Sequence, residues 1–183
     1  HARLRALREE SRAAGWTHIV YLGMGGSCLA VEAMSQVFGP RAGYPALIVM
    51  DSTHPDALRA VEAQIDMSRT LFVVASKTGN TQETIYWQRY FYSRYHGDAG
   101  EHFIAVTDAG SRLEAEARAL HFRQIFLNPE DMSGRYAALS YTGLVPAALA
   151  GLPFERIVET AAEMQAACGS GVMGNNHPGL WLG

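Results

Sequence analysis

Five short, continuously apolar runs alternate with stretches of helical periodicity, and this alternation limits the possible fold more than any other feature of the sequence. Continuously apolar runs are typical of parallel strands that are buried on both faces, and parallel strands need a helix between them. The sequence therefore predicts an α/β fold, a doubly wound five-stranded parallel sheet of order 2-1-3-4-5 with a helical C-terminal extension. The expected strands are Thr17–Leu22, Ala46–Met50, Thr70–Ala75, His102–Val106 and Phe122–Phe126.

Helix signals lie between and after these strands. Asn80 with Glu83 resembles a capping box, as does Ser111 with Glu114, and Pro55 suits the first position of a helix. We predict a first domain over residues 1–130 and a helical linker over 131–183 that leads into a second domain, absent from the chain. The expected helices are His1–Ala14, Ser27–Phe38, one from Pro55, one from Asn80 to about Tyr95, one after Ser111, then Gly134–Ala150, Pro153–Cys168 and a last one starting near Pro178.

Composition and charge exclude several classes of protein. Hydrophobic residues make up 48% and charged residues 18% of the chain, which is typical of a globular domain. The net charge of −3, with scattered basic residues, argues against a nucleic-acid partner. Pro146, Gly151 and Pro153 interrupt the longest apolar stretch, so no membrane span is expected. The two cysteines and the dispersed histidines predict no disulfide and no metal site, which favours a reducing cytoplasm.

The cations of this chain are unusual, because 14 of the 15 Lys and Arg residues are arginines. The one lysine is Lys77, which lies directly after an expected strand. An ammonium is a compact point charge with three rotatable donors, and it suits a phosphate oxygen or a reacting group. The chain also opens at His1 rather than Met and closes at Gly183, and we expect it to be a piece of a longer protein.

Two loops follow the first and third expected strands. The first, Gly23-Met-Gly-Gly-Ser27, would open a helix whose free N–H groups attract an anion, although a tight turn explains it equally well. It lacks the last glycine of the dinucleotide fingerprint. The second, Ser76-Lys-Thr-Gly-Asn-Thr81, gathers hydroxyls, the ammonium and a helix start, which is what a phosphate monoester needs; the alternative is a polar loop with a helix cap.

The order 2-1-3-4-5 reverses between strands one and three, and ligands of such sheets bind at that point, outside the carboxyl ends of the strands. Both loops are therefore expected at one crevice. A third stretch, Asp131-Met-Ser-Gly-Arg-Tyr136, lies beyond the last strand. Its Arg135 could return over the crevice, but taken by itself it is better explained as a surface arginine near a helix start.

The three stretches together resemble one known family. Gly-x-Gly-Gly-Ser after a strand, Ser-Lys-Thr-x-x-Thr-x-Glu-Thr, and Gly-Arg-Tyr ahead of Gly143-Leu-x-Pro146 occur in the order and spacing of phosphoglucose isomerase. The chain resembles the first sugar-isomerase (SIS) domain of that family, with its flavodoxin-like sheet, and the linker that follows. It departs from the family pattern at Ala30, Asn80, Ser133 and Ala137, which suggests a divergent branch.

The resemblance implies a cofactor-free isomerase that interconverts glucose 6-phosphate and fructose 6-phosphate by proton transfer, and a homodimer as the full-length protein. It implies that Arg135 stabilises the enediolate-like charge. For Glu83, a role in the pocket and a role as a helix cap both stay open. The residues implied to hold the substrate phosphate are Ser76, Lys77, Thr78 and Thr81, and those implied to line the pocket are Gly26, Ser27 and Glu83.

The general base and the ring-opening group come, in that family, from the later part of the chain and from a neighbouring subunit. The sequence contains no match to the motifs that carry them, so we expect it to bind sugar phosphate weakly without turnover. Two other functions stay open: a non-catalytic sugar-phosphate-binding domain, or the isomerase part of a sugar aminotransferase. A nucleotide-binding domain is a third possibility, although its fingerprint is lacking.

Some residues with reactive side chains are explained better by structure than by function. His54 follows the second expected strand, where a turn or cap role is favoured. Cys28 falls in the first turn of a helix, where the dipole would lower the pKa of its thiol, but a packing role is favoured. Trp87, Tyr90, Phe91 and Tyr95 have near-helical spacing, which is typical of core or interface positions.

Overall fold

The computed structural model describes residues 1–130, 132–169, 171–172 and 177–182. Asp131, where the third stretch and the expected linker begin, lies outside the described residues, as do residues 170, 173–176 and 183 of that linker. The chain divides into two compact units, His1–Leu152 and Pro153–Gly183. The expected division into a sugar-phosphate-binding domain and a linker concerns function as well as packing, and it stays a prediction.

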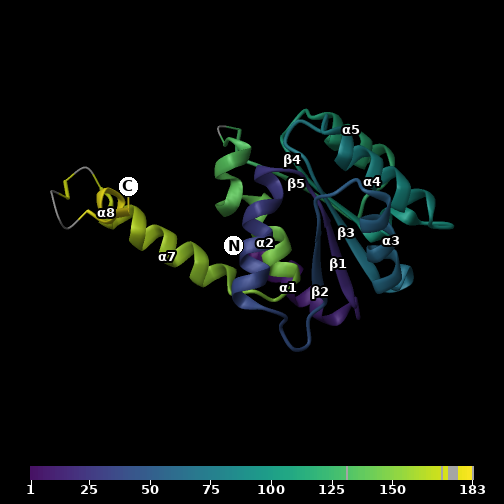
Figure 1. Ribbon diagram of the computed structural model, residues 1–183, viewed down its shortest axis with the longest axis horizontal. Coiled ribbons are helices and arrows are strands. Elements are labelled where there is room, and N and C mark those ends of the chain that lie inside the picture. Colours follow the sequence, from purple (N-terminus) through teal and green to yellow (C-terminus); the bar gives the residue numbers. More distant parts are fainter. Residues whose placement is uncertain (131, 170, 173–176, 183) are drawn as a thin grey trace. The chain divides into compact units, whose positions relative to one another are not determined.

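The first unit is built on a parallel sheet whose order is β2-β1-β3-β4-β5, as the sequence predicts (Figure 1). The central pairing aligns His18 of β1 with Thr70 of β3 and runs in register to Leu22 and Val74. The connections between successive strands cross on one face or the other, so the sheet is covered on both sides. The strands are β1 His18–Leu22, β2 Ala46–Met50, β3 Thr70–Ala75, β4 Phe103–Thr107 and β5 Gln124–Leu127.

Helices begin close to the predicted signals. Pro55 occupies the first turn of α3, and Ser111 caps α5 by accepting a hydrogen bond from the N–H of Glu114 at 3.0 Å. The described α-helices of the first unit are α1 Ala2–Ala13, α2 Gly26–Phe38, α3 Pro55–Gln64, α4 Gln82–Ser93, α5 Arg112–Ala119 and α6 Tyr141–Leu149. Short 3-10 turns are η1 Met67–Arg69, η2 Ala99–His102 and η3 Gly134–Leu139.

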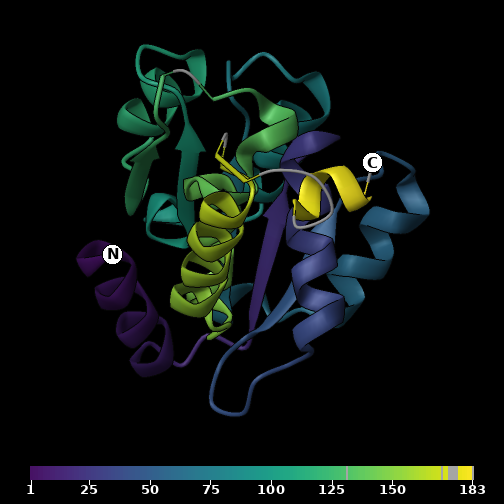
Figure 2. The ribbon, with the colours of Figure 1, turned by 90° about the vertical axis from the view of Figure 1, so that its left-hand side faces the viewer.

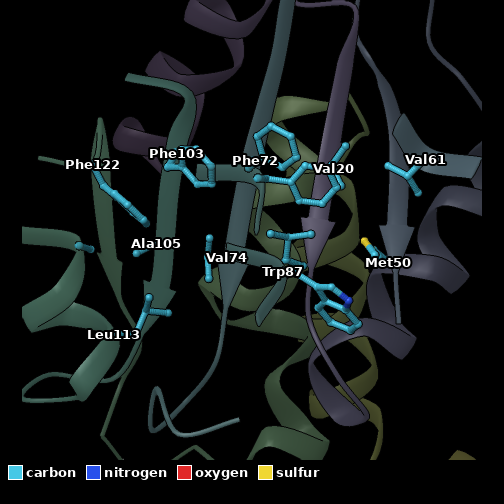
Figure 3. Packing of buried hydrophobic residues seen from close by; sticks show 13 residues of the cluster. Val20, Met50, Val61, Phe72, Val74, Trp87, Phe103, Ala105, Leu113 and Phe122 are labelled. Carbon is cyan, nitrogen blue, oxygen red and sulfur yellow. The ribbon is translucent and has the colours of Figure 1, made fainter. Parts of the chain in front are cut away.

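One face of the sheet packs against α3, α4 and α5 (Figure 1). Its core is aromatic: the Phe72 ring stacks on Phe103 at 5.1 Å between centroids and lies 4.6 Å from Phe91 of α4. Trp87 of α4, 3% exposed, packs in the same cluster (Figure 3). Tyr90 and Tyr95 are partly buried against this cluster. All four aromatic residues whose near-helical spacing predicts a core or interface position therefore pack in the core or against it.

The other face packs against α1, α2 and α6. In Figure 2, α1 and α2 lie well apart on this face, and each packs against α6. The buried Ser11 hydroxyl donates to the carbonyl of Leu149 at 2.8 Å, which joins α1 to the end of α6. Residues 134–152, beyond the last strand, therefore belong to the packing of the first unit.

Several expected boundaries differ from the structure, most of them by one or two residues. His102 closes η2 and β4 begins only at Phe103, while Phe122 is buried in the core but precedes β5. The single helix expected over Gly134–Ala150 is in fact two elements, because the Ser140 hydroxyl accepts from the N–H of Thr142 and starts α6 anew. An apolar run shows burial, but it does not show where hydrogen bonding to the neighbouring strand begins.

The second unit contains α7, Phe154–Ala167, and the short α8, Pro178–Leu182. Within it, the His177 ring lies 3.1 Å from the carbonyl of Cys168, which links the two elements. Trp181 is 82% exposed. Among the described residues, no helix combines the length and the apolar character that a membrane crossing requires.

Candidate functional site

The carboxyl ends of the parallel strands form one rim of the sheet, and the loops singled out from the sequence lie there. β1 ends at Leu22 and β3 ends at Ala75, and these two central strands are paired side by side. The chain order reverses between them, which is where open α/β sheets bind their ligands. The predicted crevice therefore has the expected place in the fold.

The loop after β3 is shaped by its own hydroxyl groups. The Ser76 Oγ, in a side chain only 4% exposed, accepts a hydrogen bond from the N–H of Gly79 at 3.1 Å and lies 3.1 Å from Thr81 Oγ1. The Thr78 hydroxyl is exposed and accepts from the N–H of Asn80 at 3.3 Å. Two of the three hydroxyls are thus turned inward to each other, while that of Thr78 faces outward.

This loop is also held to the neighbouring strand β4. The N–H of Ser76 donates to Val106 O at 3.1 Å, and the N–H of Asp108 donates to Lys77 O at 3.0 Å. The buried Thr107 hydroxyl donates to the carbonyl of Ser76 at 2.7 Å. Backbone groups at Ser76 and Lys77 are therefore fixed to the end of β4 by three consecutive residues, which leaves their side chains on a rigid base.

Lys77 turns its ammonium toward a carboxylate. Its Nζ lies 2.5 Å from Asp108 Oδ2, and the side chains are 36% and 21% exposed. Both residues line a small pocket together with Ser27, Asn128 and Gly134. Ser27 from the first loop, Lys77 from the second and Gly134 from the third stretch thus meet at one place.

Asp108 was missed by the sequence analysis. The residue directly follows β4, the strand next to β3, so its position at the same rim was available as a signal. Its second carboxylate oxygen, Oδ1, is buried and has no hydrogen-bond partner in the described structure, and the same holds for Oδ1 of Asn128. Both oxygens belong to residues of the pocket wall.

The first loop brings the start of α2 to this pocket. α2 begins at Gly26, one residue earlier than predicted, and the carbonyl of Ser27 accepts a hydrogen bond from the Tyr21 hydroxyl at 2.8 Å. The same hydroxyl lies 3.1 Å from the carbonyl of Thr142 in α6. Tyr21 is fully buried, and this burial is the main reason why the pKa of its phenol is raised well above the ordinary value.

Tyr21→Phe is expected to lower the free energy of unfolding by about 1–2 kcal/mol, because the carbonyls of Ser27 and Thr142 lose their shared donor. Urea denaturation followed by circular dichroism measures the change. The control is Tyr86→Phe, at a side chain that is 60% exposed, for which a change within about 0.5 kcal/mol is expected. Equal effects of the two substitutions would contradict this role of the Tyr21 hydroxyl.

The third stretch reaches the same rim through its backbone. A Cβ atom on Gly26 would lie 2.8 Å from the carbonyl oxygen of Gly134 and 3.1 Å from the Cα of Arg135. Gly26 is therefore required for close approach between the start of α2 and the 3-10 turn η3. The Arg135 side chain itself is exposed.

Glu83 and its expected capping partner are arranged differently from the prediction. The N-cap of α4 is Thr81 rather than Asn80, and no side chain caps this helix end, so the capping box is wrong. The Thr81 hydroxyl lies 3.1 Å from that of Ser76 within the same loop instead of capping the helix. Glu83 is half-buried in the first turn, where the helix dipole favours a negative charge.

His54 and Cys28 have the structural roles that the sequence favours, a helix cap and a packing position. The His54 ring accepts a hydrogen bond from the N–H of Asp56 at 3.2 Å and caps α3. Cys28 is 2% exposed, and burial, followed by the charge of Asp51, raises the pKa of its thiol, so the net shift is opposite to the expected lowering. Neither residue lines the pocket that Ser27 and Lys77 share.

Comparisons with known proteins agree with the fold and with the motifs. A family profile described as phosphoglucose isomerase matches residues 2–181. The glucose-6-phosphate isomerase of Cyanothece sp. is 33% identical over 163 residues, which cover 86% of this chain and 31% of that protein. A crystal structure of a glucose-6-phosphate isomerase from Chlamydia trachomatis matches with a TM-score of 0.77 and 27% identity, over 96% of this chain and 34% of that one.

A hypothetical protein from Thermus thermophilus has a still higher TM-score of 0.83, at 25% identity, over 93% of this chain and 41% of that one. The chain thus spans about a third of the length of the isomerases that it matches. The profile match extends over nearly all of the sequence, and the rim of the sheet carries the motifs from which the resemblance was drawn. This chain belongs to the phosphoglucose isomerase family.

Proposed function

We propose that this chain is the phosphate-binding part of a glucose-6-phosphate isomerase, which interconverts glucose 6-phosphate and fructose 6-phosphate. The observation that carries the proposal is the meeting of Lys77 with Ser27 and the Gly134 backbone at one pocket on the carboxyl rim. A cation, hydroxyl groups and a helix N-terminus together suit a phosphate dianion. Family membership supports the identity of the sugar.

In this proposal the loop after β3 holds the phosphate. Lys77 supplies the charge, and Thr78 supplies an exposed hydroxyl. Ser76 and Thr81 lie 3.1 Å apart, and since a hydrogen bond between two hydroxyls uses one proton, the other proton can turn to a phosphate oxygen. Gly26, Ser27 and Glu83 would border the sugar.

Arg135 is proposed to act on the reacting part of the sugar. Proton transfer between C1 and C2 passes through an enediolate-like state, whose negative charge a fixed guanidinium would stabilise. The contact of Gly26 with the backbone at Gly134 and Arg135 supports this, because it fixes the base of the side chain beside α2. The general base and the ring-opening group are proposed to lie in the part of the protein that this chain does not contain.

The partners follow from the same proposal. A second SIS domain of the parent protein would complete the active site, and the complete protein would form a homodimer. The cytoplasmic location predicted from the cysteine content stays a prediction. The reaction as proposed needs no cofactor, because a proton moves between neighbouring carbons of one substrate.

A thermal-shift experiment with an isomerase assay tests the proposal. The chain is expected to be stabilised by millimolar fructose 6-phosphate and, less strongly, by inorganic phosphate, because the phosphate makes the main contacts. Fructose lacks the phosphate, and AMP carries a nucleoside in place of the hexose, so neither is expected to stabilise the chain. No turnover of fructose 6-phosphate is expected. Stabilisation by AMP alone would favour a nucleotide site, and a normal isomerase rate would show that this chain holds the base.

A further inference from the structure

The carboxylate of Asp108 is the one acidic group among the described residues that line the pocket, and Lys77 is the one basic group. Asp108 Oδ2 accepts from Lys77 Nζ at 2.5 Å, while Oδ1 is buried without a partner in the described structure. The other lining side chains carry no charge. The ammonium therefore has a single counter-charge at this site.

The backbone at Asp108 is hydrogen-bonded to the backbone at Lys77. Its N–H donates to the carbonyl of Lys77 at 3.0 Å, and its own carbonyl accepts from the N–H of Ser111 at 3.3 Å. The Thr107 hydroxyl, one residue earlier, lies 2.6 Å from Ser111 Oγ and 3.1 Å from the carbonyl of Lys77. Both ends of the ion pair thus belong to one hydrogen-bonded platform at the ends of β3 and β4.

Two opposite consequences for phosphate binding can be derived from a carboxylate in this position. As a bare negative charge near a dianion, it would weaken binding by repulsion. As an anchor, it would strengthen binding, because a lysine side chain loses much rotamer freedom when its ammonium is fixed. One of the three N–H bonds of the ammonium is used by Asp108, which leaves two for phosphate oxygens.

We propose that Asp108 is a positioning residue, which holds the Lys77 ammonium in the pocket so that it meets the phosphate group of the sugar. The anchor prevails over the repulsion because the carboxylate is already paired at 2.5 Å and its backbone is fixed on both sides. A rigid pair keeps the site near its binding geometry before the ligand arrives. This inference rests on the proposed function, since it assigns Lys77 to the phosphate.

The test is a titration of this chain with fructose 6-phosphate, followed by NMR, for Asp108→Ala and Asp108→Asn. Asp108→Ala is expected to weaken binding about ten-fold, although it removes a negative charge from an anion site. Asp108→Asn keeps an oxygen that accepts from the ammonium, and it is expected to bind within about two-fold of the unchanged chain. The control is Asp98→Ala, at an exposed aspartate whose side chain does not cap η2, and it is expected to change nothing.

The same titration in a Lys77→Met background shows whether Asp108 acts through the lysine. There, adding Asp108→Ala is expected to have no further effect on affinity, because the group to be positioned is gone. Melting temperatures of all variants show that they are folded at the temperature of the titration. If Asp108→Ala alone does not fold, Asp108→Ser, which keeps a small polar side chain at the position, replaces it.

Three outcomes would overturn the inference. Unchanged or tighter binding by Asp108→Ala would show that the carboxylate only repels the ligand. An equal loss in the Lys77→Met background would show that Asp108 does not act through the lysine. Absence of binding by the unchanged chain would contradict the proposed function itself, and the inference with it, whereas binding that Asp108→Ala does not weaken contradicts the inference alone.

Discussion

Lys77→Met is expected to weaken the binding of fructose 6-phosphate by about 100-fold, which corresponds to about 2.7 kcal/mol. The substitution removes the one cation among the described residues of the pocket wall and keeps most of the volume of the side chain. Hydrogen bonds to charged groups contribute about 1.5–3 kcal/mol each, so the loss of one or two bonds to the phosphate has this size. Isothermal titration calorimetry or NMR titration measures the change.

Lys77→Arg is the matched variant, because it keeps the charge and changes the geometry. The planar guanidinium cannot replace a compact ammonium 2.5 Å from Asp108 without a shift of the loop. We expect a loss of about ten-fold, between the unchanged chain and Lys77→Met. If Lys77→Met binds as tightly as the unchanged chain, the ammonium is not a phosphate ligand and the proposed function fails at its centre.

Gly79→Ala is expected to lower the free energy of unfolding by roughly 3 kcal/mol. Gly79 has a φ of +71°, which costs energy for any other residue, and a Cβ at this position would overlap the backbone N of Leu113 and lie 2.9 Å from its Cβ. Neither backbone can move easily, because the Ser76 hydroxyl holds the loop and α5 packs in the core. Chemical denaturation measures the change.

Gly110→Ala separates the two causes. Gly110 has nearly the same φ, +72°, but its added Cβ would meet nothing within 4 Å. Only the cost of the positive φ remains, and the free energy of unfolding is expected to fall by about 1 kcal/mol. Equal losses at Gly79 and Gly110 would show that the contact with α5 is not tight, and that the loop after β3 can move away from it.

The strand order and the approximate strand positions could be predicted from the sequence because they depend on local patterns. Ala46–Met50 and Thr70–Ala75 are apolar runs flanked by polar residues or turn signals, and both agree with the structure to the residue. Phe122 shows the limit of this reasoning. Its side chain is buried at the end of the core cluster, so it has the sequence character of a strand residue without the backbone pairing of one.

The site could be predicted less fully, because its details depend on contacts between distant residues. Lys77 stood out by being the single lysine, and its loop was placed by the order of the strands. Its partner Asp108 lies 31 residues further along the chain and has no motif of its own. The false capping box at Asn80 has a local origin, since the hydroxyl of Thr81 lies 3.1 Å from that of Ser76, five residues earlier, and α4 begins after Thr81.

The parallel direction of the strands separates the molecule into a ligand rim and an opposite rim, and this decides how the chain should be fixed to a sensor surface. Amine coupling would attach a fraction of the molecules through the ε-amine of Lys77, beside the α-amine of His1, and that fraction would have a blocked pocket. Ala42 is exposed in the loop between α2 and β2, at the other rim. A thiol placed there as Ala42→Cys, with Cys168→Ser to remove the half-exposed native thiol, would immobilise the chain with its pocket directed toward the analyte.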